Sequence, residues 1–254
     1  MEHTNLHHKN LLNTGLLIFI ILAFITFIEF FVAITNQSIF LLSVAAVIKC
    51  GLVLYYYMHI YKLGESEIST DHHSPEWKIV TNRLGFWLFL LSDAFLFAGL
   101  FVTRFNLLGL TRPDLNQYLG LFVTVVLLVS SFFMNRAEVY MNLGNIRGFI
   151  ICTGITILLG TGFLAGVIGV EWQNAPFSVS DSATSAVFFM MTGMHAFHVL
   201  TGVIFLGIVL NNGRRGLYTP ENHWAVEAAT VYWHFIDVVW IFFYPALYLI
   251  GRLS

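Results

Sequence analysis

Seven long apolar runs limit this chain to very few folds. Each is close to the length of about 20 residues that a helix needs to cross the hydrocarbon core of a bilayer. The runs occupy residues 12–34, 39–61, 85–103, 118–135, 148–170, 183–211 and 224–250. Because hydrocarbon offers an exposed backbone no hydrogen-bond partner, each run is expected to form a helix. The sequence therefore predicts an all-α, polytopic membrane protein with seven transmembrane helices.

The composition supports a membrane protein and excludes several other classes. Charged residues make up 10% of the 254 residues, against about 25% in soluble domains. A soluble protein of this size would lack enough polar side chains to cover its surface. The net charge of −2, without a Lys/Arg-rich stripe, excludes a nucleic-acid-binding protein. Cys50 and Cys152 each lie inside an apolar run, so a disulfide framework is excluded as well.

The loop charges and loop lengths predict the orientation and the domain organisation. Eight of the twelve Lys and Arg residues lie in segments on the N-terminal side of the membrane. The opposite side holds Arg104, Arg112 and Arg252. Since positive loops stay inside, the N-terminus is predicted to be cytoplasmic. The polar stretch 63–84 is the longest inner loop, which predicts a two-helix unit (1–62), a linker (63–84) and a five-helix domain (85–254).

Ionisable and polar residues inside spans are costly, so each is a candidate functional residue. They are Asp93 in the third span, His195 and His198 in the sixth, and Glu227, Thr230, His234 and Asp237 in the seventh. The four in the seventh span share one helical stripe, which must face protein. At 1.5 Å per residue, Asp93, His198 and His234 lie roughly 14 to 18 Å from the inner end of their spans. They are predicted to form a hydrogen-bonded cluster.

Three interpretations of this cluster remain open. It can tie helices together through satisfied buried hydrogen bonds. It can handle protons beside another subunit. It can also ligate a metal or haem, with His195 and His198 on one face and His234 on another helix. The last interpretation needs ligands that the sequence does not supply nearby, and Asp93 and Asp237 already offer the imidazoles partners.

Two further features concern the first two spans and the fifth. Glu29 and Lys49 lie on adjacent antiparallel helices, so a buried ion pair between them is predicted. The alternative is that each group reaches another neighbour or a lipid headgroup. The fifth span contains a glycine series that includes Gly162 and Gly166, a spacing that lets helix backbones approach closely.

Three segments resemble subunit III of the haem-copper terminal oxidases. They are GFWLFLLSDAFLFA at 85–98, FFMMTGMHAFHVLTG at 188–202 and VEAATVYWHFIDVVW at 226–240. The last is the most specific, and the resemblance covers about 77–254. Asp93 departs from the Glu that is frequent at this position in the family, and in this it resembles the quinol-oxidising branch. By this resemblance, Asp93, His195, His198, Glu227, His234 and Asp237 take a structural or proton-antenna role.

The first two spans are similar to a different subunit. AVIKCGLVLYYYMHI at 46–60, with a Glu in the preceding span, resembles subunit IV of bacterial oxidases. This motif is shorter and less specific. The chain would then be a fusion of subunit IV to subunit III, joined at 63–84.

The resemblance implies a non-catalytic core subunit of a proton-pumping oxygen reductase. Such a subunit supports assembly, lipid binding and proton uptake by the catalytic subunit. It implies haem and copper in subunits I and II, none in this chain, bound phospholipid, and cytochrome c or quinol as the electron donor. The expected location is the bacterial inner membrane. The alternatives are a quinol oxidase subunit, a homologue associated with nitric oxide reductase, or a proton-coupled transporter using Asp93 and His234.

Overall fold

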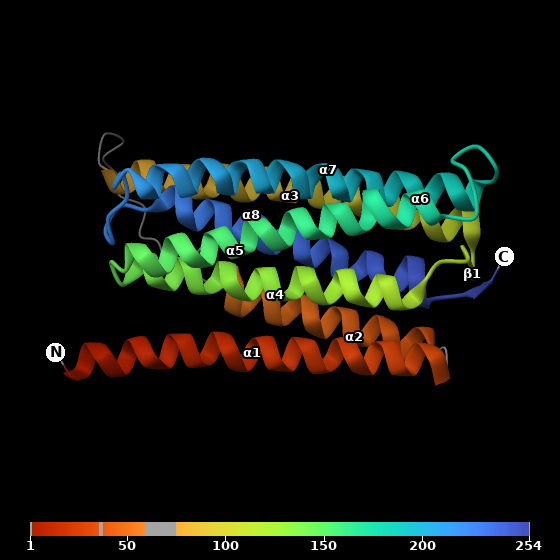
Figure 1. Cartoon of the computed structure of the whole chain (residues 1–254), viewed down its shortest axis with the longest axis horizontal. Coiled ribbons are helices and arrows are strands. Elements are labelled where there is room, and N and C mark those ends of the chain that lie inside the picture. The colour runs from red at the N-terminus through yellow and green to blue at the C-terminus, as the bar shows by residue number, and fades with distance from the viewer. Residues whose placement is uncertain (1, 36–37, 59–74, 254) are drawn as a thin grey trace.

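The structure is a bundle of long helices that run nearly parallel to one another (Figure 1). The computed structural model describes residues 2–35, 38–58 and 75–253. The α-helices are α1 (Glu2–Thr35), α2 (Ile39–Leu52), α3 (Pro75–Leu108), α4 (Gln117–Asn142), α5 (Ile146–Leu164), α6 (Trp172–Asn174), α7 (Ala183–Arg214) and α8 (Trp224–Tyr244). The π-helical segments η1 (Val53–Tyr57), η3 (Ala165–Glu171) and η4 (Pro245–Leu249) extend α2, α5 and α8.

Seven helices of the described part are long and apolar enough to cross a membrane, as predicted. α5, η3 and α6 together form one of them, Ile146–Asn174. Large apolar side chains such as Phe24, Phe40 and Phe95 are exposed on the outer faces, where lipid would cover them. The prediction of an all-α membrane protein with seven spans is confirmed.

The ends of the helices differ from the apolar runs. α3 begins at Pro75, inside the predicted linker, because a proline fits the first position of a helix and the helix continues past its apolar part. Residues 63–74 of that linker lie outside the described residues. α4 begins at a cap in which the Asn116 side chain accepts hydrogen bonds from the backbone of Tyr118 and Leu119.

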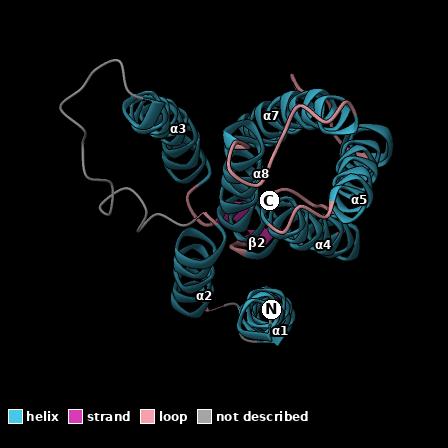
Figure 2. Ribbon diagram, turned by 90° about the vertical axis from the view of Figure 1, so that its left-hand side faces the viewer, coloured by secondary structure: helices cyan, strands magenta, loops and turns pink. Residues whose placement is uncertain are grey.

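α8 is the most buried of the spans and α3 the least. Seen from the end, α4, α5, α7 and α8 form a ring, α3 lies outside it beside α7 and α8, and α1 and α2 lie against α4 and α8 (Figure 2). Gly15 permits a close approach of α1 to α4, because a Cβ there would lie 2.6 Å from Asn135 Oδ1. α1 and α2 therefore pack directly on the rest of the bundle.

A buried arginine joins the end of α3 to the C-terminal segment. Arg104 is predicted from the loop charges to lie in an outer loop, but it lies within α3 and is fully buried. Its guanidinium donates to the carbonyls of Gly109, Thr111, Ala246 and Ile250. Beside it, β1 (Thr111–Arg112) pairs in parallel with β2 (Arg252–Leu253). Arg104 thus replaces the water that would otherwise satisfy these helix-end carbonyls.

Candidate functional site

The carboxyl group of Asp93 and the imidazole of His198 meet between α3 and α7. Asp93 Oδ2 lies 3.6 Å from His198 Nε2. The other ring nitrogen, Nδ1, lies 2.8 Å from the Met194 carbonyl oxygen. Because a carbonyl only accepts, Nδ1 carries a hydrogen and donates it. In a neutral ring Nε2 would then present a lone pair to the carboxyl group of Asp93.

This pair lines a groove of about 440 Å³ between α3, α7 and α8. The remaining lining residues are Phe86, Phe89, Phe197, Thr201, Phe205 and Tyr232. Tyr232 and Thr201 share a hydrogen bond of 2.8 Å at its wall. The groove is therefore mainly aromatic, with a carboxyl–imidazole pair and two hydroxyl groups as its polar part.

His234 lies on another face of α8. Its Nδ1 is 2.8 Å from the hydroxyl of Ser131 on α4, and the ring of Tyr57 from η1 packs against it with 4.9 Å between centroids. Tyr232, two residues earlier, faces the Asp93 groove. Residues two apart on a helix point about 200° apart. His234, Asp93 and His198 were predicted to lie at a common depth. His234 nevertheless points away from the groove that Asp93 and His198 line, so the predicted three-residue cluster does not form.

Asp237 and His195 are buried at different places. Asp237 lines a small cavity with Lys49, next to Ser131. His195 is fully buried between Trp240 and Phe163, with ring centroids 4.9 and 5.5 Å away. Among the described residues, neither of its ring nitrogens has a hydrogen-bond partner.

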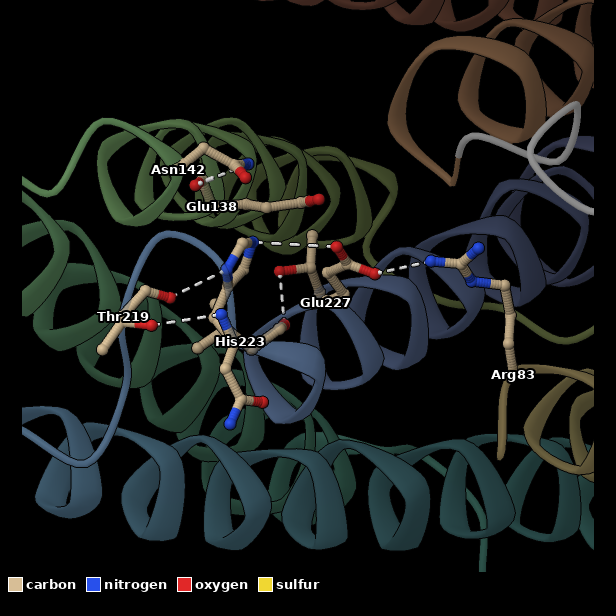
Figure 3. A network of polar contacts seen from close by, with 9 residues as sticks. Arg83, Glu138, Asn142, Thr219, His223 and Glu227 are labelled. Atoms are coloured by element: carbon tan, nitrogen blue, oxygen red, sulfur yellow. Dashed lines mark hydrogen bonds and ion pairs between the residues drawn. The ribbon is translucent and has the colours of Figure 1, made fainter. Parts of the chain in front are cut away.

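Glu227 belongs to a polar network at the start of α8 (Figure 3). Its Oε2 lies 3.2 Å from Arg83 Nη2, and its Oε1 lies 3.7 Å from His223 Nε2. The side chain of Glu138, from α4, extends alongside this network. Arg83 also lies over the Trp224 ring, 5.5 Å from its centroid. The network links α3 to the start of α8 at one end of the bundle, with α4 beside it.

The Arg83–Glu227 pair is expected to contribute little to stability. Both side chains keep more than a fifth of their surface exposed, and such pairs contribute about 1 kcal/mol or less. Glu227→Gln should therefore lower the thermal midpoint of the purified protein by about 3 °C at most. A much larger fall would show that the network is a structural requirement at this end of the bundle.

The structure places Glu29 and Lys49 together inside the two-helix unit. The Lys49 ammonium donates to Glu29 Oε2, and both side chains are almost completely buried. Removal of either partner alone would leave the other charge buried without compensation, which is strongly destabilising.

Several polar partners were not singled out from the sequence. They are Ser131, which contacts His234; Arg83 and His223, which contact Glu227; and Tyr248, which donates to Glu171 at 2.5 Å. Ser130 and Ser131 stand as adjacent polar residues in an apolar run, which is the signal that could have identified them. The described residues contain no group of three or more His, Cys, Asp or Glu that could hold a metal ion.

Comparison with known proteins identifies clear relatives. Residues 35–252 match the family model described as cytochrome c oxidase subunit III. The quinol oxidase subunit 3 of Bacillus subtilis (strain 168) is 36% identical over 197 residues, which cover 74% of this chain and 95% of that protein. The cytochrome c oxidase subunit 3 of Thermostichus vulcanus is 31% identical over 188 residues, 71% of this chain and 91% of that protein. That of Papio hamadryas is 36% identical over 199 residues, 73% of this chain and 75% of that protein.

Proposed function

Because the chain belongs to the cytochrome c oxidase subunit III family, we propose that it supports assembly, lipid binding and proton uptake in a proton-pumping oxygen reductase. It is a non-catalytic subunit of a haem-copper oxidase, and a multi-pass protein of the bacterial plasma membrane. The observation that carries this function is the match over 35–252. The proposed partners are subunits I and II, which would hold the haem and copper.

The proposed electron donor to the complex is cytochrome c, with quinol as the alternative. The names of the relatives include both kinds of oxidase. Oxygen consumption by the purified complex, with reduced cytochrome c and with a quinol supplied separately, distinguishes the two. If the complex consumed oxygen with quinol and not with cytochrome c, quinol would be the electron donor and the cytochrome c proposal would be wrong.

Two proposals about the first two helices go with this function. The N-terminus is cytoplasmic, as the loop charges predict. The two-helix unit is related to subunit IV, on the strength of the motif at 46–60. The family match begins at residue 35 and so includes α2. Labelling of single cysteines placed on either side of the membrane would test the orientation.

The α3–α8 side of the bundle offers a site for phospholipid. A groove of about 320 Å³ is lined almost entirely by apolar residues, among them Phe97, Ala98, Phe101, Phe235 and Phe242. Its surface suits an acyl chain, because apolar area is buried without a polar group to desolvate. Mass spectrometry of lipids retained by the purified complex would test this.

The Asp93–His198 pair supports a proton-holding role. Because Nδ1 of His198 donates to the Met194 carbonyl, a neutral His198 ring has no hydrogen on Nε2. The Nε2 lone pair would then face the carboxylate of an ionised Asp93, and the two would repel each other. A proton shared between the two groups turns this contact into an attraction. Such a pair in a groove open to the outside of the subunit can exchange a proton with a neighbouring subunit or its waters.

Asp93→Asn tests this role. If the pair holds a proton for uptake, the complex should assemble with normal stability but lose activity severalfold faster during turnover. If the pair is structural, the thermal midpoint should fall instead, because His198 loses its partner at depth. Ser92→Ala is the matched control, since Ser92 is exposed and, among the residues that the structure describes, bonds only the Phe89 carbonyl of its own helix. Unchanged assembly, activity and lifetime in the Asp93 variant would remove both roles.

A further inference from the structure

The two-helix unit and the five-helix bundle meet through polar as well as apolar contacts. Tyr57 of η1 packs on His234 of α8 and donates to the Gly15 carbonyl of α1, at 3.1 Å. Phe19 of α1 stacks near Phe132 of α4, with 4.8 Å between centroids. The interface is therefore close-packed on the N-terminal side of the level where Lys49 and Asp237 lie.

A small cavity lies within this interface. It offers about 20 Å³ to the centre of a water-sized sphere, and one water molecule needs about 10–15 Å³ by that measure. Its polar lining comes from four helices: Thr26 of α1, Lys49 of α2, Thr124 of α4 and Asp237 of α8. The cavity is thus large enough for one water and carries the several polar partners that a buried water requires.

The hydrogen-bond directions around the cavity are complementary to a water molecule. Thr26 and Thr124 donate their hydroxyl hydrogens to carbonyls of their own helices, so they can only accept from a water. The Thr124 oxygen already accepts from the Trp240 indole N–H at 2.9 Å, which leaves it one lone pair. Lys49 gives one of its three N–H groups to Glu29. It therefore has hydrogens left to donate. The Asp237 carboxyl group accepts from Ser131 and, with two oxygens, keeps lone pairs for a second donor. A water between them can accept from the ammonium and donate to the carboxyl group.

We propose that this cavity binds one structural water molecule that bridges Lys49 and Asp237. Lys49 then bonds to two carboxyl groups, to Glu29 directly and to Asp237 through the water. A water-mediated contact of this kind is nearly as favourable in enthalpy as a direct one. The bridge connects a buried lysine of the two-helix unit to a buried carboxyl group of the five-helix bundle. It joins the two units by hydrogen bonds.

The first test needs no variant. A density map of the purified complex, at a resolution that shows its other internal waters, should contain a peak between Lys49 Nζ and the Asp237 carboxylate. A clear map without such a peak would overturn the proposal.

The second test measures coupling between the two residues. Lys49→Met and Asp237→Asn are compared with the double variant by the thermal midpoint for release of the chain from the purified complex. We expect the fall in thermal midpoint of the double variant to be smaller than the sum of the two single falls, by about 3 °C or more. Cys50→Ala is the control for Lys49, and it should be additive with Asp237→Asn. Additive losses for the Lys49 pair would contradict the bridge, whatever the stability of each single variant.

Discussion

Arg104→Met is expected to cause the largest loss of stability of any single substitution considered. The guanidinium makes four hydrogen bonds to carbonyl oxygens at 2.7 to 3.0 Å, in a fully buried position. Hydrogen bonds to charged groups contribute about 1.5–3 kcal/mol each. Their loss would leave several carbonyls at the ends of α3 and η4 unsatisfied. Allowing for relaxation, we expect a loss of about 4 kcal/mol, or a fall of about 10 °C in thermal midpoint.

The measurement is thermal release of the chain from the purified complex. Thr103→Val is the matched control, because the neighbouring Thr103 is exposed and, within the described part of the chain, bonds only the Gly99 carbonyl of its own helix. It should change the midpoint by no more than about 2 °C. If Arg104→Met behaved like Thr103→Val, the connection between α3 and the C-terminal segment would not depend on this side chain.

Gly160→Ala is expected to destabilise the bundle, although alanine favours a helix more than glycine does. A Cβ at Gly160 would lie 2.5 Å from the indole ring of Trp233, which is itself fully buried. Rigid aromatic atoms cannot give way cheaply, and overpacking of this kind costs about 1–3 kcal/mol. The thermal midpoint should fall by about 3–9 °C.

Gly162→Ala provides the contrast on the same helix. A Cβ at Gly162 would meet no atom of residues 2–35, 38–58 or 75–253 within 4 Å. The substitution should therefore leave stability unchanged or raise it by about 0.5–1 kcal/mol, the helix propensity difference. Equal losses at 160 and 162 would mean that α5 tolerates no side chain on either face, and that Trp233 is not the cause.

The spans could be predicted because crossing a bilayer is a local requirement on about 20 consecutive residues. The burial of Thr230, His234 and Asp237 follows equally from their helical spacing. Spacing along one helix does not say which neighbour a residue faces. For that reason the sequence could group His234 with Asp93 by depth, whereas the structure turns His234 towards Ser131 and Tyr57.

Contacts between distant segments were the hardest to predict. The sequence predicts a loop position for Arg104 because the residue follows an apolar run. Two of its acceptors, the carbonyls of Ala246 and Ile250, are over 140 residues away in the sequence, so the pattern around Arg104 does not indicate them. In the fifth span, the Gly162 and Gly166 spacing indicates a close approach, yet Gly166 and Gly160 are the crowded positions and Gly162 is open. The spacing identifies a helix rich in small residues, but the positions of Trp233 and Val123 decide which glycines are required.

We propose that this chain acts as a subunit III without a redox centre of its own. The measurement that tests this proposal is the subunit composition and absorption spectrum of the complex that purifies with the tagged chain. We expect the haem- and copper-bearing oxidase subunits to co-purify with it in equal amounts, and the chain separated from them to show no haem absorbance. A stable chain that purifies without those subunits, or that carries haem when alone, would contradict the account.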